Sequence, residues 1–226
     1  MILVTGATGI LGRVIVLELL KRGKTVRATK RKSSNLQEVR KSFQFYTETP
    51  NEYFDSIEWI EVDFEDIHSL QNALNGVEEV YHCAAKVSFH PKDEKKMYQT
   101  NIEGTKQLLF ACQNSSVKKF LFVSSIAVLD GLNENGELDE SSDFNPKIDH
   151  SEYAISKHFS EMEVWRASAE GLNTVIVNPG LIIGSGNWKE SSGTLFMEFE
   201  KNDYTFSGGT SYVDVRDVAQ ISIELM

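Results

Sequence analysis

Three glycines at a regular spacing follow directly after an apolar segment at the start of the chain. Residues 1–5 have the sequence MILVT, the glycines are Gly6, Gly9 and Gly12, and residues 10–22 carry apolar side chains at helical spacing. Glycine accepts turns and close contacts that a Cβ atom forbids. This pattern predicts a strand–turn–helix unit, and it constrains the fold more than any other feature of the sequence.

Short β-branched runs alternate with helix-like segments along the rest of the chain. Further strands are predicted at 24–29, 58–62, 77–82, 119–123 and 173–178, and helices near 66–75, 94–113 and 152–170. Strands that are apolar on both faces and separated by helices are typical of a parallel sheet with helices on both sides. We therefore predict an α/β fold with a doubly wound, Rossmann-type parallel sheet, in which ligands bind at the carboxyl ends of the strands.

Three segments do not fit this simple alternation. Residues 41–57 form a polar and aromatic insert, and residues 129–151 are predicted to form a long loop over the carboxyl edge of the sheet. The last segment, DVRDVAQISIELM, has helical periodicity but no residue that terminates a helix. We expect one NAD(P)-binding domain over residues 1–226, truncated before or within a small C-terminal substrate lobe.

Composition excludes several classes of protein. Lys and Arg number 23 against 33 Asp and Glu, so the formal net charge is −10, which argues against nucleic acid as a partner. Cys83 and Cys112 lie outside any metal-ligand or CxxC spacing, so we expect neither a disulfide scaffold nor a metal site. No apolar run approaches the roughly 18 residues of a membrane-spanning helix, and no signal peptide is recognised. We predict a cytoplasmic protein without a membrane partner.

The glycine turn predicts a dinucleotide site. Gly6 permits a tight turn, Gly9 lets the backbone approach a pyrophosphate, and Gly12 lets helix and strand pack closely. Free amides at the N-terminus of the following helix then bind the phosphates. The other contacts expected from this loop are Thr8, Ile10 and Leu11. The spacing is GxxGxxG rather than GxGxxG, and a plain glycine turn is the alternative interpretation.

The end of the second strand favours NADP over NAD. An NAD site has an acidic residue here for the ribose 2′-hydroxyl, whereas the sequence VRATKRK has no carboxylate. Guanidinium and ammonium groups pair well with a phosphate dianion. We predict NADP as the cofactor, with Arg31 as the leading contact and NAD as the alternative. A solvated basic turn is the other interpretation of this segment.

Two further strand ends offer cofactor contacts. Asp63 is expected to bind the adenine amine, with Phe64 beside it. His82 is interpreted as a core histidine, and Cys83 as a small buried apolar residue. The contacts expected after the fourth strand, where small side chains let a dinucleotide lie against the backbone, are Ala84, Ala85 and Lys86.

A tyrosine and a lysine four residues apart share one face of the helix predicted over 152–170. Free tyrosine, with a pKa of about 10, is a poor acid or base at neutral pH. A nearby ammonium group favours the phenolate and lowers that pKa, so Tyr153 is the candidate acid/base and Lys157 its partner. The serines of VSS, at the end of the fifth strand, can orient a substrate carbonyl. An isolated YxxxK is a weak pattern, but its order after the glycine turn and the serines is specific.

Together these motifs resemble the extended short-chain dehydrogenase/reductases of the NAD-dependent epimerase/dehydratase superfamily. The resemblance covers nearly the whole chain through TGATGILG, YHCAAKVSF, NIEGT, VSSIAV, YAISK, NPGLIIGSGNW and TSYVDVRDVA. TVRATKR is most similar to the dihydroflavonol-4-reductase-like reductases. The resemblance implies hydride transfer between a nicotinamide and a small-molecule substrate, and it suggests a homodimer through the helices at 94–113 and 152–170.

The resemblance also implies roles for individual residues. Tyr153 would be the general acid/base, Lys157 its electrostatic partner and ribose anchor, and Ser125 the serine that orients the carbonyl. Asn101 would order its helix and a water near Lys157. The loop that the family places beside the nicotinamide consists of Pro179, Gly180, Leu181 and Ile182.

Three functions remain open at this point. The first is an NADP-dependent reductase of a small ketone or aldehyde, of dihydroflavonol-reductase or sterol-dehydrogenase type. The second is a nucleotide-sugar epimerase or dehydratase with tightly held NAD, and the third is a non-catalytic dinucleotide sensor, which needs no acid/base. The first is supported by the basic strand end and by aromatic residues of the insert, which equally fit ordinary packing: Phe43, Phe45, Tyr46, Tyr53 and Phe54.

Overall fold

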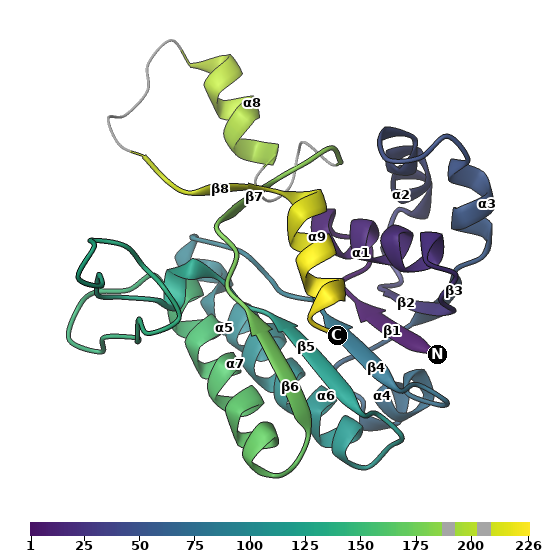
Figure 1. Cartoon of the computed structure of the whole chain (residues 1–226), viewed down its shortest axis with the longest axis horizontal. Coiled ribbons are helices and arrows are strands. Elements are labelled where there is room, and N and C mark those ends of the chain that lie inside the picture. The colour runs from purple at the N-terminus through teal and green to yellow at the C-terminus, as the bar shows by residue number, and fades with distance from the viewer. Residues whose placement is uncertain (187–192, 203–208) are drawn as a thin grey trace.

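The computed structural model describes residues 1–186, 193–202 and 209–226. Its main sheet is parallel, with the strand order β3-β2-β1-β4-β5-β6 (Figure 1). The strands are β1 (Ile2–Thr5), β2 (Val26–Lys30), β3 (Glu58–Glu61), β4 (Glu79–His82), β5 (Lys119–Val123) and β6 (Asn173–Val177). The order reverses between β1 and β4, so the sheet is doubly wound, as the alternating pattern predicts.

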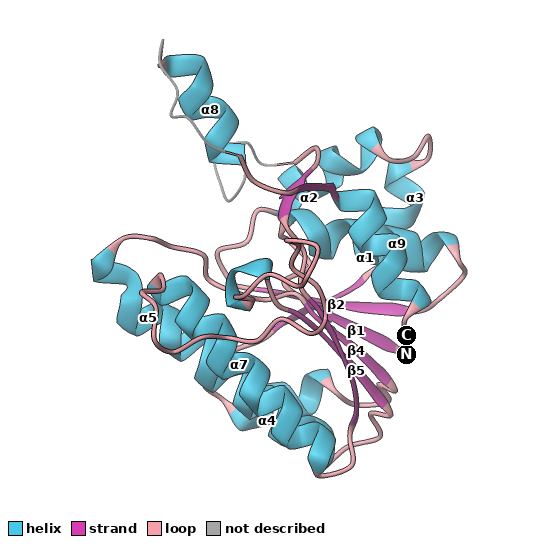
Figure 2. Cartoon of the chain, turned by 60° about the vertical axis from the view of Figure 1, so that its left-hand side comes forward, coloured by secondary structure: helices cyan, strands magenta, loops and turns pink. Residues whose placement is uncertain are grey.

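Helices cover both faces of this sheet (Figure 2). On one face lie α1 (Ile10–Lys21), α2 (Leu36–Ser42), α3 (Pro50–Asp55) and α9 (Val215–Glu224). On the other lie α4 (Ile67–Ala73), α6 (Gly104–Gln113) and α7 (Glu152–Ala169). The short helix α5 (Glu94–Tyr98) packs against α7.

Strand β1 shows why both faces must be covered. Ile2 and Val4 belong to the core beneath α1 and α9, whereas Leu3 belongs to the core beneath α4 and α6. Successive side chains of a strand point to opposite faces, and all three of these residues are buried. A strand of this kind is stable only at the centre of a three-layer structure.

The aromatic insert packs into the core. Its chain forms the end of α2, a 3₁₀ turn and then α3. The rings of Phe43 and Phe54 lie 6.0 Å apart, and Trp59 of β3 lies 5.7 Å from Phe54. Phe43 and Phe54 are buried beside α1, so the packing interpretation holds for them and they give no support to the reductase interpretation.

The helix predicted over 94–113 is interrupted in its middle. Helix α5 ends at Tyr98, residues Gln99–Glu103 form a π-helical turn, and α6 begins at Gly104. Such turns are frequent at functional sites because they re-aim the side chains that they carry. Here the turn carries Asn101.

The long loop at 129–151 is fastened to α7. Its only regular pairing is an isolated bridge between Asp130 and Asp143. The ring of Phe144 stacks between two histidines, with centroids 4.1 Å from His150 and 4.0 Å from His158 of α7. These contacts hold the loop beside the helix that carries Tyr153.

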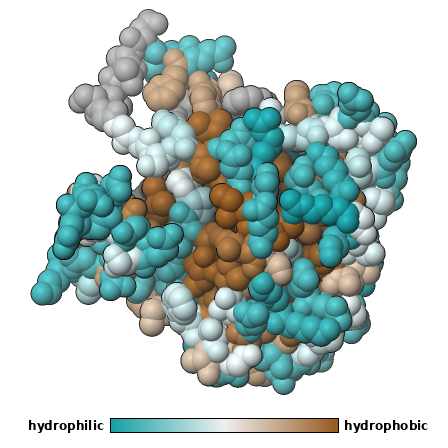
Figure 3. Space-filling view, in the orientation of Figure 1, coloured by the Kyte–Doolittle hydropathy of each residue, from teal (hydrophilic) through white to brown (hydrophobic). Residues whose placement is uncertain are grey.

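A second, smaller parallel sheet lies beyond β6. It pairs β7 (Leu181–Ile183) with β8 (Tyr212–Asp214), and α8 (Gly193–Lys201) stands away from the main sheet (Figure 1). Helix α9 follows β8 directly and packs against α1. Hydrophobic surface is visible in the centre of Figure 3, and residues of β6 and α9 that are only partly buried include Val175, Val177 and Ile223. The last two residues of the NPGLIIGSGNW motif, Asn187 and Trp188, lie outside the described residues.

Over the part of the chain that the structure describes, no helix has the length and apolar character needed to cross a membrane. Within the same residues, no three or more His, Cys, Asp or Glu side chains gather as a metal ion requires.

Candidate active site

The glycine turn lies at the carboxyl end of β1, against the segment that follows β4. Gly6 has a φ of +63°, and a Cβ there would lie 2.6 Å from the amide nitrogen of Ala84. A Cβ on Gly12 would lie 2.3 Å from the carbonyl oxygen of Gly6. Gly9 has an ordinary φ of −76°, and its Cβ would lie 3.2 Å from that oxygen. The fold therefore requires glycine at 6 and 12. At Gly9 a Cβ would fit after a small shift of its neighbour, so we expect glycine there to matter for the approach of a ligand to the backbone. Ala85 beside the turn is exposed.

The N-terminus of α1 has the properties of an anion site. Gly9 is its N-cap and makes no side-chain hydrogen bond, and the first turn has no acidic residue. The first amides of a helix, here those of Ile10 and Leu11, have no acceptor within the helix, and its dipole favours negative charge. With Thr8 half-buried in the turn, these residues fit the pyrophosphate of a dinucleotide.

Arg13 stiffens the turn, and sequence reasoning missed it. Its side chain is buried and donates to the carbonyl oxygens of Thr8 and of Gly9, the latter from Nε at 3.1 Å. It also makes two contacts of 2.6 and 3.1 Å with the Glu38 carboxylate on α2. The one available signal was an arginine at a buried helical position, and its partner is 25 residues away.

The basic strand end lies at the same edge of the sheet. Lys30 is the last residue of β2 and pairs with Glu61 at 3.8 Å. Arg31 and Lys32 follow and are exposed. The Arg31 amide donates to Ser34 Oγ at 3.0 Å, which turns the chain toward α2. The contact of Arg31 with a 2′-phosphate stays a prediction.

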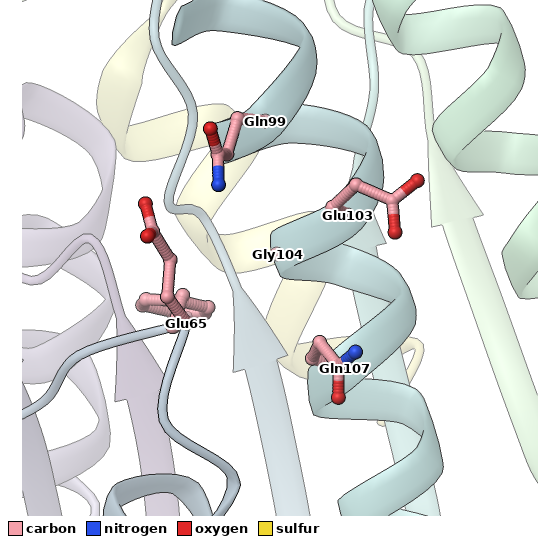
Figure 4. Close-up of a pocket in the computed structure, with 6 residues that line it drawn as sticks. Glu65, Gln99, Glu103, Gly104 and Gln107 are labelled. Atoms are coloured by element: carbon pink, nitrogen blue, oxygen red, sulfur yellow. The ribbon is translucent and has the colours of Figure 1, made fainter.

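The residues after β3 lie in a tight turn. Asp63 is exposed, and its carboxylate accepts a hydrogen bond from the Glu65 amide at 2.9 Å. The Phe64 ring packs 5.8 Å from that of His82. Phe64 also borders a recess of about 320 Å³ beside α6, drawn in Figure 4, whose other lining residues are Glu65, Gln99, Glu103, Gly104 and Gln107. None of the candidate catalytic residues lines this recess, and the adenine contacts of Asp63 and Phe64 stay predictions.

His82 has a structural role. Its Nδ1 lies 2.6 Å from Thr5 Oγ1 and its Nε2 lies 3.0 Å from Thr105 Oγ1. Burial, with a smaller contribution from the Lys157 charge, lowers the pKa of His82 to about 3. The neutral ring therefore joins β1, β4 and α6, which confirms the core interpretation. Burial likewise raises the pKa of the Cys83 thiol to about 12.

Ser125 and Tyr153 come together where β5 ends beside α7. Ser151 caps α7 by accepting from the Ala154 amide at 3.2 Å, so the helix begins just before Tyr153. Ser125 caps the short turn after β5, which packs against α7, and its side chain is the hydrogen-bonding group that acts on the pKa of Tyr153.

Lys157 lies one turn farther along the same face of α7. It is only 3% exposed, and its Nζ donates to the Val123 carbonyl at 2.6 Å and lies 4.4 Å from the centre of the Phe122 ring. Burial lowers the pKa of Lys157 to about 8, against the opposing influences of Cys83 and Glu161. The ammonium group is thus held against β5.

The pKa of Tyr153 is raised, whereas the sequence pattern predicts that a nearby ammonium group lowers it. Burial raises the pKa of Tyr153, and the hydrogen bond with Ser125 offsets that rise only in part. Desolvation of the phenol, which disfavours its charged form, is the larger influence on this pKa. Tyr153 therefore carries its proton at neutral pH.

Asn101 fastens two segments around this group. Its Oδ1 accepts from the Lys86 amide at 2.7 Å, and its Nδ2 donates to the Lys86 carbonyl at 3.0 Å and to Ser156 Oγ at 2.9 Å. Its own carbonyl accepts from Ser160 Oγ at 2.8 Å. Asn101 is buried and acts as a positioning residue for the segment after β4 and for α7.

The loop after β6 joins the serine strand end to the small sheet. The Pro179 carbonyl accepts from the amide that follows Ser125 at 3.1 Å, and the Leu181 amide donates to the Ser211 carbonyl at 2.8 Å. A Cβ on Gly180 would lie 2.6 Å from that same oxygen. Leu181 and Ile182 begin β7, and the nicotinamide contacts of this loop stay predictions.

Comparison with known proteins gives one family match over almost the whole chain. The family model described as "NAD dependent epimerase/dehydratase family" matches residues 2–226. Sterol demethylase protein B of Methylococcus capsulatus is 31% identical over 227 residues, which cover 99% of this chain and 64% of that protein. A putative dihydroflavonol 4-reductase of Synechocystis sp. is 30% identical over 222 residues, covering 96% of this chain and 60% of that protein. The chain thus spans less than two thirds of the length of either relative.

A solved structure shares the fold. It is a UDP-N-acetylglucosamine 4-epimerase from Methanobrevibacter ruminantium in complex with UDP-N-acetylmuramic acid. It superposes with a TM-score of 0.77 and 26% identity, over 98% of this chain and 71% of that one.

Proposed function

The chain belongs to the NAD-dependent epimerase/dehydratase family, and from this premise we propose that it transfers hydride between NADP and a carbonyl or alcohol of a small molecule. The observation that carries the proposal is the placement of Tyr153 and Lys157 one turn apart on α7, which packs against the strand-end turn that Ser125 caps. The similarity to a putative dihydroflavonol 4-reductase supports reductase chemistry. The absence of a carboxylate from the sequence VRATKRK supports NADP within the NAD(P) cofactors of the family.

Each side chain of the group has a distinct task in the reducing direction. A dinucleotide held by the glycine turn would supply the hydride from its nicotinamide. Tyr153 donates its proton to the carbonyl oxygen as negative charge develops there, and Ser125 orients that oxygen by a hydrogen bond. The Lys157 ammonium, fixed by the Val123 carbonyl, stabilises the phenolate that Tyr153 becomes.

The test is NADPH oxidation by the purified protein against a panel of ketones, aldehydes and nucleotide sugars. We expect the absorbance of NADPH to fall when a ketone or aldehyde is added and to stay constant when a nucleotide sugar is added. A panel in which no carbonyl compound consumes NADPH would contradict the proposal.

A nucleotide-sugar epimerase is the second candidate, favoured by the similarity to the epimerase structure with bound UDP-N-acetylmuramic acid. This chemistry regenerates its cofactor at each turnover. The purified protein would then release NAD on denaturation and interconvert sugar epimers without added cofactor. Release of no dinucleotide would remove this candidate.

We also propose a homodimer through α6 and α7. These helices pack side by side, and the pair exposes roughly half of each of four large apolar side chains: Phe110, Phe159, Met162 and Trp165. We expect light scattering after gel filtration to give a mass of twice 25.5 kDa. Trp165→Glu should give the mass of the monomer. Leu132→Glu, at an exposed site in the 129–151 loop, is the control. A monomeric wild type would refute the dimer. The cytoplasmic location expected from the sequence stays a prediction.

A further inference from the structure

An exposed phenylalanine lies beside the candidate acid. Phe89, between β4 and α5, is 77% exposed, and its ring centroid is 6.1 Å from that of Tyr153 at an interplanar angle of 63°. Leaving a phenyl ring in water forgoes about 2 kcal/mol of burial. Ligand sites are lined mainly by apolar and aromatic side chains, so this ring offers a contact to a ligand bound beside Tyr153.

The segment that carries Phe89 is held in place on both sides. Before it, the Lys86 amide and carbonyl are both bonded to Asn101, at 2.7 and 3.0 Å. Next to it, Ser88 Oγ donates to the Asp93 carboxylate at 2.7 Å and accepts from the amide that follows Phe89 at 3.2 Å. The ring is therefore presented from an anchored backbone, which lowers the entropy lost when a ligand binds it.

Exposure alternates along this segment. Lys86 and Ser88 are half-buried and bonded to the protein, whereas Val87 is 46% exposed, like Phe89 two residues farther on. Exposed side chains at this spacing lie on one side of an extended chain. Val87 is thus a second exposed apolar side chain, two residues before the ring that lies beside Tyr153.

We propose that Phe89 determines substrate specificity by binding an aromatic ring carried a few bonds from the reacting carbonyl. This inference rests on the proposed hydride transfer. If Tyr153 and Ser125 hold the carbonyl oxygen, the substituents of the carbonyl carbon extend near Tyr153, where Phe89 is the neighbouring apolar surface. Two rings attract one another at centroid distances of about 4.5–7 Å, and a straight alkyl chain does not gain that contact.

Equilibrium binding tests the inference without turnover. The protein is saturated with NADP⁺, which has no hydride to donate, and titrated calorimetrically with benzylacetone or with the straight-chain methyl hexyl ketone. We expect the aromatic ketone to bind about tenfold more tightly, corresponding to about 1.4 kcal/mol. Phe89→Ala should abolish this preference and Phe89→Tyr should retain it. Phe45→Ala, at an exposed phenylalanine of the insert, is the matched control and should change neither affinity.

The outcomes separate this inference from the proposed function. A preference for benzylacetone that persists in Phe89→Ala, equal binding of the two ketones by the wild type, or binding of neither overturns the role of Phe89. If NADPH is then oxidised equally with the two ketones, the proposed hydride transfer is retained and only the role of Phe89 is refuted. Ring-selective binding that Phe89→Ala abolishes, in a protein that oxidises no NADPH with either ketone, supports the inference and refutes the proposed reaction.

Discussion

The phosphate end and the catalytic end of the candidate site are built from different parts of the chain. At the phosphate end, Gly6 and Gly12 leave no room for a Cβ, and the binding surface is backbone. At the catalytic end, the roles proposed for Ser125, Tyr153 and Lys157 belong to their side chains, and a buried hydrogen bond to the Val123 carbonyl holds the Lys157 ammonium group. A substitution removes space at one end and a functional group at the other. The two ends should therefore fail in different ways.

The largest effect is expected from Tyr153→Phe, which changes the catalytic end alone. Removing the proton donor should lower kcat about a thousandfold. The affinity for NADPH and the melting temperature should stay close to wild type, because the ring and its packing remain. Steady-state rates, calorimetry and thermal unfolding measure the three quantities. Tyr212→Phe, at an exposed tyrosine, is the control, and activity of Tyr153→Phe within a few-fold of wild type would contradict the assignment.

Two glycine substitutions separate folding from binding at the phosphate end. In Gly12→Val the new Cβ would lie 2.3 Å from the Gly6 carbonyl oxygen. We therefore expect the free energy of unfolding to fall by about 3 kcal/mol. Cofactor binding should be lost as well. In Gly9→Val the backbone conformation is allowed, so the melting temperature should change little. Its affinity for NADPH should fall about a hundredfold, the equivalent of one strong charged hydrogen bond.

Thermal unfolding and calorimetry on both glycine variants decide the matter. Equal destabilisation by the two substitutions would show that Gly9 is also needed for the fold. Unchanged NADPH affinity in Gly9→Val would remove the pyrophosphate from this turn.

The catalytic end should also respond to pH through Lys157. Its pKa of about 8 lies below the ordinary lysine value of 10.5, so its charge is lost as the pH rises through about 8. Carbonyl reduction should fall about fivefold between pH 8 and pH 9, because the phenolate left by Tyr153 loses its counter-charge. The folded state binds fewer protons than the unfolded state between these two pKa values, so this group makes stability rise over the same range.

Rate profiles and melting curves over pH 6–10 distinguish this loss of charge from unfolding, because activity and stability then move in opposite directions. Lys157→Arg keeps its charge throughout and should remove the alkaline decline. A decline that persists in that variant would belong to another group. His82, with a pKa of about 3, should contribute no change over this range.

The smallest effect is expected at the basic strand end. Arg31→Ala should weaken NADPH binding about fivefold, as one exposed charge pair is worth about 1 kcal/mol, and should leave NADH binding unchanged. Arg22→Ala, at an exposed arginine after α1, is the control. Equal effects of Arg31→Ala on the two cofactors, or a wild-type preference for NADH, would reject NADP as the cofactor.

Much of the fold could be predicted because its signals are local. The six strands lie within a few residues of the predicted runs, since apolar β-branched segments and helical periodicity are read over short windows. The helix at 94–113 was predicted as one piece because a π-helical turn around Asn101 leaves the apolar period nearly intact. The sequence did not indicate which aromatic side chains of the insert are buried, since a buried and an exposed phenylalanine are the same residue type.

The sequence by itself determined the order of elements, the glycine turn and the placement of a serine, a tyrosine and a lysine at one edge of the sheet. Only the tertiary structure decided how the pKa values of the tyrosine and the lysine are shifted and which contacts hold the site together. Burial raises the pKa of Tyr153. Lys157 donates to the Val123 carbonyl, and Arg13 contacts the Glu38 carboxylate of another helix. Desolvation and long-range pairing depend on which distant segments come together, and no short stretch of sequence contains that information.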